Sequence, residues 1–153
     1  MTRRTDLRRQ IRVKTKNVVT QRDRRFTVQI TPEDLKPVTR RLMGIEGYSH
    51  LSTITAVDTE QGIETIYHHV CKDAIISLKT LVSKENPTLP TIVDVIPGAA
   101  LYEREVHDLF GVKFEGNPDL SRLLLPDRWP EAIQPLRKWW TTERISSRLK
   151  RVQ

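Results

Sequence analysis

The sequence has only one cysteine, Cys71, which excludes an internal disulfide bond and an iron–sulfur cluster held by cysteines of this chain alone. Its neighbours Val70 and Ala74 predict a small buried side chain rather than a reactive thiol. Phosphate-binding signatures are also missing: there is no Gly-x-Gly-x-x-Gly, no Walker-type loop and no nucleophile elbow. We therefore expect no nicotinamide, flavin or nucleotide site in this chain.

Long hydrophobic runs are absent as well. Asp94 and Pro97 interrupt the best candidate, and no run approaches the roughly 20 apolar residues of a membrane helix. The basic N-terminus has no hydrophobic region behind it, so we expect no secretory signal. These features predict a cytoplasmic protein.

Acidic residues are outnumbered: 26 Lys and Arg face 19 Asp and Glu, which gives a formal net charge of +7. The excess is concentrated at the two ends, in a basic N-terminal arm (residues 1–10) with the strand that follows it, and in a cluster of Arg144, Arg148, Lys150 and Arg151. Such ends attract polyanions, which leaves nucleic acid, acidic lipid headgroups and an acidic protein as candidate partners. No RNA-binding or helix-turn-helix signature accompanies the charge.

The pattern of apolar residues predicts an α+β, two-layer domain over residues 11–125, with a mixed or antiparallel sheet of about five strands and helices on one face. Strands are expected at 11–19, 26–30, 48–58, 63–71 and 74–82, a loop at 86–90, a short apolar helix or strand at 91–96 and a brief strand at 112–114. Thr31-Pro32 starts a helix that ends at Gly44 or Gly47, and Pro37 is expected to bend or shorten it. Residues 126–153 form an extended tail rich in proline and tryptophan.

A second helix is predicted over residues 99–110, where Tyr102, Val106, Leu109 and Phe110 form one apolar stripe and Gly111 supplies a left-handed cap. Carboxylates stand on both sides of this stripe: Glu103 with His107 on one side, Glu105 with Asp108 on the other. Packing therefore desolvates some of them, and a buried carboxylate needs a partner, for which Arg104, Arg122 and Arg137 are candidates. Arg104 has the helical spacing to pair with Asp108.

Catalytic and metal sites are weakly supported by these residues. Glu103 and His107 have the spacing of two metal ligands on a helix, but two ligands do not make a site. His68 and His69 are adjacent on a predicted strand, so they point to opposite faces. We expect no catalytic, cofactor-binding or metal-binding residue here, and we read the tryptophans of the tail as anchors on another surface.

Three stretches carry a family resemblance: YEREVHDLFGVKF, EGNPDLSRLLLPD and WPEAIQPLRKWW. They resemble the 30 kDa subunit family of NADH:quinone oxidoreductase (respiratory complex I), which includes the equivalent subunits of complex-I-like membrane-bound NiFe hydrogenases and deazaflavin-dependent dehydrogenases. Asn117 stands where the family usually has histidine, and Trp139 where aspartate is common. His107, with LLLPD and WPE, looks more like the hydrogenase or ferredoxin-type branches than the quinone-linked one.

The resemblance implies a structural, non-catalytic subunit of the peripheral arm, on the cytoplasmic side of a membrane, that packs against a large subunit and a small Fe–S subunit. It implies no cofactor in this chain, Fe–S clusters and a quinone or NiFe site in partner subunits, and no nucleic acid; the alternative is a basic nucleic-acid-binding module. The residues that it assigns to the family motif and a subunit interface are Tyr102, Glu103, Arg104, Glu105, His107, Asp108, Phe110, Gly111, Gly116, Pro118, Asp119, Arg122, Trp129, Pro135, Arg137 and Trp139.

Overall fold

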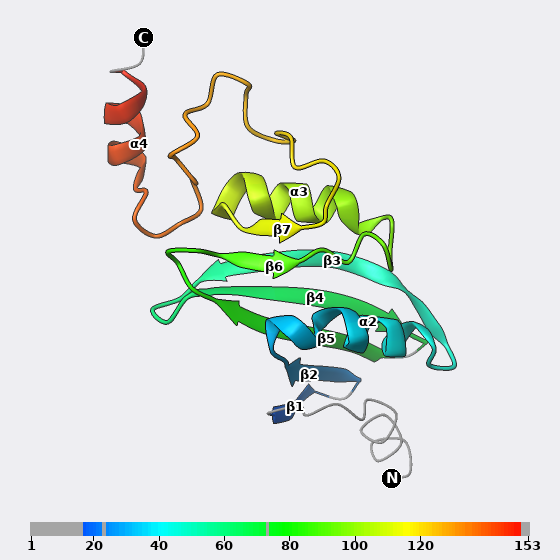
Figure 1. Cartoon of the computed structure of the whole chain (residues 1–153). Coiled ribbons are helices and arrows are strands. Elements are labelled where there is room, and N and C mark those ends of the chain that lie inside the picture. Colours follow the sequence, from blue (N-terminus) through cyan, green and yellow to red (C-terminus); the bar gives the residue numbers. More distant parts are fainter. Residues whose placement is uncertain (1–16, 23, 73, 151–153) are drawn as a thin grey trace.

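The computed structural model describes residues 17–22, 24–72 and 74–150. The predicted basic arm (1–10) and the first part of the predicted strand 11–19 lie outside these residues. The elements (Figure 1) are β1 (Asn17–Arg22), β2 (Arg25–Gln29), η1 (Pro32–Asp34), α2 (Leu35–Met43), β3 (Tyr48–Asp58), β4 (Ile63–Cys71), β5 (Ala74–Val82), β6 (Thr88–Pro90), α3 (Ala99–Phe110), β7 (Lys113–Glu115) and α4 (Thr142–Leu149). None of the helices in this described part is long and apolar enough to cross a membrane.

The main sheet has five strands in the order β1-β2-β5-β4-β3. β1 and β2 form an antiparallel hairpin, and β3, β4 and β5 form an antiparallel meander. β2 and β5 are parallel, so the sheet is mixed. This confirms the predicted fold class, and the predicted limits of β3, β4 and β5 agree with the structure.

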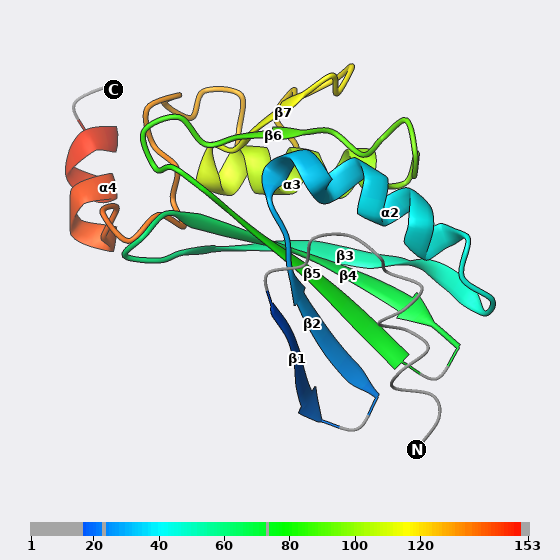
Figure 2. The ribbon, with the colours of Figure 1, turned by 60° about the horizontal axis from the view of Figure 1, so that its bottom comes forward.

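Both α2 and α3 cover the same face of the sheet (Figure 2), which gives the two layers. Residues alternate between buried and half-buried along β4, as expected for a strand with one covered face. His69 and Tyr67 are fully buried on the covered side, whereas His68 is half-buried, so the two adjacent histidines do face opposite sides. Cys71 is buried, as predicted.

The first helix is divided near its start. A short 3-10 turn (η1) precedes α2, and the helix ends at Gly44, one of the two predicted positions. Pro37 lies in the first turn of α2, where a backbone N–H has no partner within the helix, so proline is tolerated there.

Two local predictions are wrong. Residues 88–90, predicted as part of a loop, form β6, which pairs in parallel with β7 as a second, two-stranded sheet. Residues 91–96, predicted as a helix or strand, contain neither, and residues 93–95 form a turn. Strands of three residues are too short to show an alternating pattern, which explains why the sequence does not reveal them.

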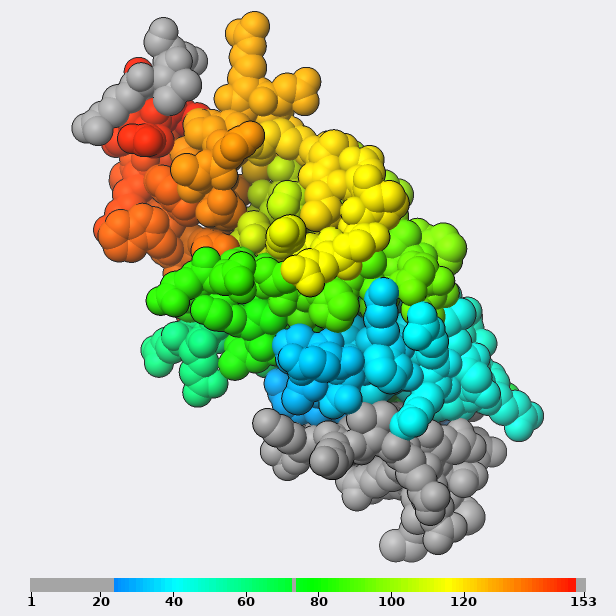
Figure 3. Space-filling model, viewed as in Figure 1, coloured from blue at the N-terminus to red at the C-terminus, as the bar shows by residue number. Residues whose placement is uncertain are grey.

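The C-terminal segment departs from the predicted extended tail at its end, because residues 142–149 form α4. Residues 116–141 have no regular helix or strand and run over α3. In the space-filling view (Figure 3), this segment and α4 make up one end of the molecule. The surface that the family resemblance points to is therefore formed largely by irregular chain.

Candidate partner-binding surface

The α3 helix carries a fully buried carboxylate, Glu103. It accepts hydrogen bonds from the Thr91 hydroxyl (2.6 Å), the Ile92 amide (2.8 Å) and the Asn117 side-chain amide (2.8 Å). Burial raises the pKa of the Glu103 carboxyl, and these three bonds oppose the rise only in part. Glu103 thus joins α3 to the segment after β6 and to the turn after β7. Asn117 makes this contact at the position where the resemblance led us to expect histidine.

A second buried carboxylate, Asp108, holds the next loop. One of its oxygens accepts from three successive backbone amides, those of Leu123 (3.3 Å), Leu124 (2.9 Å) and Leu125 (2.8 Å), and the other accepts from Arg122 (3.4 Å). Burial acts to raise the pKa of Asp108, but the amides and the Arg122 guanidinium bring it below its ordinary value. Leu123 and Leu124, whose amides the carboxylate binds, have exposed side chains, whereas Leu125 is half-buried.

The predicted ion pair between Arg104 and Asp108 does not form, because Arg104 binds a different part of the same loop. Its guanidinium donates to the Ser121 carbonyl (3.1 Å), the Ser121 hydroxyl (3.0 Å) and the Arg122 carbonyl (2.9 Å), and it lies 3.7 Å from the Asp119 carboxylate. The prediction that Arg122 partners a carboxylate of α3 is correct. Glu103 and Asp108, which lie on opposite sides of the apolar stripe of α3, are both buried, as expected. Both accept hydrogen bonds from groups of the same chain.

Arg137 fastens the end of the segment to the body. It donates to the Phe110 carbonyl (2.7 Å) and the Lys84 carbonyl (3.0 Å), where α3 and the loop after β5 meet. Gly111 caps α3 in the left-handed conformation with φ of 71°, and a Cβ atom there would lie 2.8 Å from Gln134 Cγ. Glycine is thus needed both for the turn and for the close approach of the segment.

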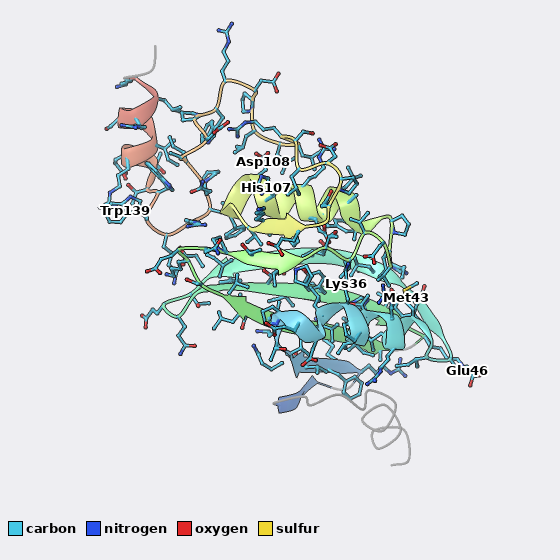
Figure 4. All side chains as sticks on the ribbon, in the orientation of Figure 1. Lys36, Met43, Glu46, His107, Asp108 and Trp139 are labelled. Atoms are coloured by element: carbon cyan, nitrogen blue, oxygen red, sulfur yellow. The ribbon has the colours of Figure 1, made fainter. Side chains whose placement is uncertain are left out.

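Near its end, the segment 116–141 reaches β3, an edge strand of the main sheet. The Lys138 amide donates to Asp58 (2.9 Å), whose carboxylate also forms a 2.7 Å ion pair with Lys84. Ile133 is buried, and its carbonyl accepts from the Trp129 indole at 2.9 Å. Trp129 is therefore an anchor on its own chain. Trp139, in contrast, is 66% exposed and lies at the end of the molecule next to α4 (Figure 4).

Several large apolar side chains on or beside this segment are exposed, namely Leu101, Leu123, Leu124, Leu136 and Trp139. Only Trp139 is among the predicted interface residues. The run Leu123-Leu124-Leu125 is visible in the sequence, but its outward orientation depends on Asp108. We call Leu123, Leu124, Leu136 and Trp139 the exposed apolar set. Exposed apolar side chains of this kind mark candidate interaction surfaces when they cluster on one part of a protein.

The remaining predicted residues lie around this framework. The His107 Nδ1 contacts the Val112 carbonyl at 2.8 Å, and because a carbonyl only accepts, Nδ1 carries the proton. Glu103 and His107 are thus engaged separately and do not form a joint site. Phe110 is buried, Tyr102, Glu105 and Pro135 are half-buried, and Gly116, Pro118 and Asp119 are exposed.

An open hollow of about 510 Å³ separates α3 from the segment, lined by His107, Asp108, Arg122 and Glu131 among others. Asp108 and Arg122 already bind within the chain there. No group of three or more His, Cys, Asp or Glu in the described residues is arranged to hold a metal ion.

Comparison with known proteins places the chain in a family. Residues 28–145 match the model of the respiratory-chain NADH dehydrogenase 30 kDa subunit. The chain belongs to this family. It is 36% identical over 120 residues to the NADH-quinone oxidoreductase C subunit of Roseiflexus castenholzii, covering 74% of this chain and 68% of that protein. It spans only 17% of the corresponding C/D protein of Methylococcus capsulatus, to which it is 39% identical over 103 residues.

Solved structures agree with this assignment. A chain of an archaeal respiratory membrane complex, the membrane-bound sulfane sulfur reductase, superposes with a TM-score of 0.83 at 26% identity, covering 97% of this 30 kDa-family chain and 92% of its own length. The trypsin-resistant fragment (1–134) of Nqo5 superposes with a TM-score of 0.66 at 25% identity, covering 78% of this chain and all of the fragment.

Proposed function

We propose that this 30 kDa-family chain is a non-catalytic, structural component of the peripheral arm of a complex-I-type electron-transfer assembly. In this role it joins a large subunit to a small Fe–S subunit. The observation that carries the proposal is the exposed apolar set, which lies on a segment held rigidly by α3 in a chain of this family. Apolar side chains in fixed positions suit a permanent protein interface, which typically buries on the order of 2,000 Å² or more.

The way the segment is held supports this role. Glu103 and Asp108 are satisfied by donors of their own chain, so their charge shapes the surface rather than acting on a substrate. Leu123 and Leu124, which Asp108 turns outward, are 38% and 56% exposed. In this proposal the exposed leucines contact the partner, whereas Glu103 and Asp108 stay buried and hold the loop in place.

The Nqo5 fragment supports a division between body and tail. The fragment that resists trypsin corresponds to most of this chain but not to all of it. We infer that the part of this chain that corresponds to the fragment folds independently.

Cofactors and location follow from the same proposal. Fe–S clusters, and a quinone or NiFe site, belong to the partner subunits, and this chain holds none. It reaches the cytoplasmic face of the membrane through these partners. Its Cys71 is buried and single, which is consistent with the absence of a cluster bound by this chain alone.

The test is recovery of the complex through an affinity tag on this chain. Leu124→Glu places a charge in the proposed interface, and Met43→Glu places the same charge on an exposed apolar position (41%) of α2, far from Trp139 (Figure 4). We expect the wild-type chain and Met43→Glu to recover partner subunits containing Fe–S clusters, and Leu124→Glu to recover at least about tenfold less. A wild-type chain that purifies alone, with no redox subunit, contradicts the proposal.

A further inference from the structure

One end of the main sheet carries a hollow on the face that α2 and α3 leave open (Figure 2). The hollow has a volume of about 730 Å³, and its lining includes Gln29 of β2, Val57 of β3, Glu64 of β4 and Leu81 of β5. Val57, Glu64 and Leu81 pair across three neighbouring strands, so their side chains lie on the same face. The residues next to Gln29, Glu64 and Leu81 along their strands are buried on the covered face. The hollow therefore crosses the open face from β2 to β3.

The lining of this hollow is partly apolar and more acidic than basic. Val57 is 45% exposed and Leu81 is half-buried, so both can receive apolar side chains. The charged residues of the lining are three acids and one base, namely Asp58, Glu60, Glu64 and Lys138. Asp58 and Glu64 each pair with a lysine, whereas Glu60 has no ion-pair partner among the described residues. The hollow therefore suits a ligand with apolar and basic side chains better than a polyanion.

The chain itself supplies such a segment directly before β1. Residues 11–16, which lie outside the described residues, read Ile-Arg-Val-Lys-Thr-Lys. Basic residues alternate there with Ile, Val and Thr, a pattern of period two that is typical of an extended chain with one basic and one largely apolar side. Asn17, the first residue of β1, pairs with Gln29, which lines the hollow. The segment 11–16 is therefore joined to the described structure at the rim of the hollow.

The length of this segment matches the width of the sheet. In the order β1-β2-β5-β4-β3, four strand spacings of about 4.8 Å separate β1 from β3, which gives about 19 Å. Six extended residues span about 20 Å. The segment 11–16 is thus long enough to run from Asn17 across the hollow to Val57.

We propose that the segment 11–16 folds back over the open face of the main sheet and lies in this hollow. Ile11 then contacts Val57 on β3. Val13, two residues closer to β1, contacts Leu81 on β5. Burial of these apolar side chains is the main contribution to docking, because apolar surface removed from water is stabilising whatever the salt concentration.

Charge adds direction to this arrangement. Arg12 lies between the two apolar residues in sequence, and its long side chain reaches the rim, where it pairs with Glu60 in the turn between β3 and β4. An exposed ion pair of this kind contributes little to stability, but it selects a basic segment over an acidic one. Docking holds the basic N-terminus against its own chain, which reduces its attraction to polyanions. The inference does not depend on the proposed function.

The first test is disulfide formation in the full-length chain, in a Cys71→Ala background. Val13→Cys is combined either with Leu81→Cys in the hollow or with Met43→Cys, an exposed position of α2 on the covered side of the sheet. A disulfide requires Cα atoms within about 7 Å of each other. Under mild oxidation we expect the first pair to form an intramolecular disulfide at least about tenfold faster than the second. Equal rates for the two pairs overturn the proposal, and so does a disulfide that links two chains, which assigns the hollow to a second copy.

The second test is a charge reversal at the rim. Glu60→Lys removes the proposed partner of Arg12, and Glu46→Lys makes the same change in charge before β3, at the opposite end of that strand (Figure 4). Trypsin cuts a segment in proportion to the fraction of time that it is undocked. We expect cleavage after Arg12 and Lys14 to be about threefold faster in Glu60→Lys than in wild type, and unchanged in Glu46→Lys.

Equal cleavage of the segment 11–16 in wild type and Glu60→Lys overturns the docking proposal and leaves the hollow to another protein. The same rise in cleavage in both variants also overturns it, because the effect then comes from net charge alone. Neither test uses a partner subunit, so either outcome leaves the structural role of the chain as it stands.

Discussion

Asp108 offers the sharpest test of how this chain builds its surface. Asp108→Asn keeps the shape of the side chain but removes the charge that accepts three backbone amides and pairs with Arg122. A hydrogen bond to a charged group contributes about 1.5–3 kcal/mol, and the contributions of neighbouring bonds are not additive. The site is close to solvent on the Arg122 side, so we expect Asp108→Asn to cost about 2 kcal/mol and Asp108→Ala about 3 kcal/mol.

The sign of the pH dependence provides an independent check. The folded-state pKa of Asp108 is lowered, so its contribution is present above the unfolded value of about 3.9 and is lost as the pH falls through the lower folded value. The stability difference between wild type and Asp108→Asn should therefore be smaller at about pH 3 than at pH 7. Urea denaturation of the purified chain at both pH values measures it.

A local readout separates this loop from the rest of the fold. Loss of the Asp108 bonds should release residues 122–125, and trypsin should then cut after Arg122 faster than in wild type. Asp119→Asn is the matched control, since its side chain is 58% exposed and the expected change in stability is within about 0.5 kcal/mol. A stability difference that stays the same from pH 7 to pH 3, or no faster cleavage after Arg122, would refute the reasoning.

Three further predictions concern buried polar groups. Burial raises the pKa of Glu103, so stability falls as the pH rises above about 4.5, and Glu103→Gln should flatten the thermal stability profile above that pH. Burial lowers the pKa of His69 to about 4, so stability should fall as the pH drops from about 6.5 towards 4, and a His69→Phe variant should lose this dependence in the same melting series. The Thr80 hydroxyl is buried without a hydrogen-bond partner among the described residues, and Thr80→Val should leave urea stability unchanged or raise it by up to about 1 kcal/mol, whereas a clear loss contradicts this.

The main sheet could be predicted from the sequence because its signal is local. The strands β3, β4 and β5 alternate along most of their length between a covered and an open face, and the turn residues between them are clear. The α3 helix has the matching 3.6-residue pattern and ends at Gly111. The parallel pairing of β2 with β5 cannot be predicted from the residue pattern of either strand, because it depends on where α2 packs.

The part of the chain after β7 is predicted less well, for two different reasons. The α4 helix carries a readable signal that the prediction missed: Thr141 is a good N-terminal cap, followed by Glu143 in the first turn. The three backbone amides that bind Asp108, in contrast, could not be read from the sequence, although Arg122 was among the candidate partners. Residue spacing on a helix favours Arg104, and only the path of the loop brings three amides to the carboxylate instead.

The buried carboxylates Glu103 and Asp108 explain why a segment without regular secondary structure can serve as a permanent protein interface. A flexible loop loses conformational entropy each time it binds, unless contacts within its own chain already hold it in the bound conformation. Glu103 fixes the turn at Asn117 and Asp108 fixes the backbone of Leu123 and Leu124, so this part of the surface is already in place in the isolated chain. The exposed side chains of Leu123 and Leu124 should therefore contribute to binding affinity with little cost of ordering.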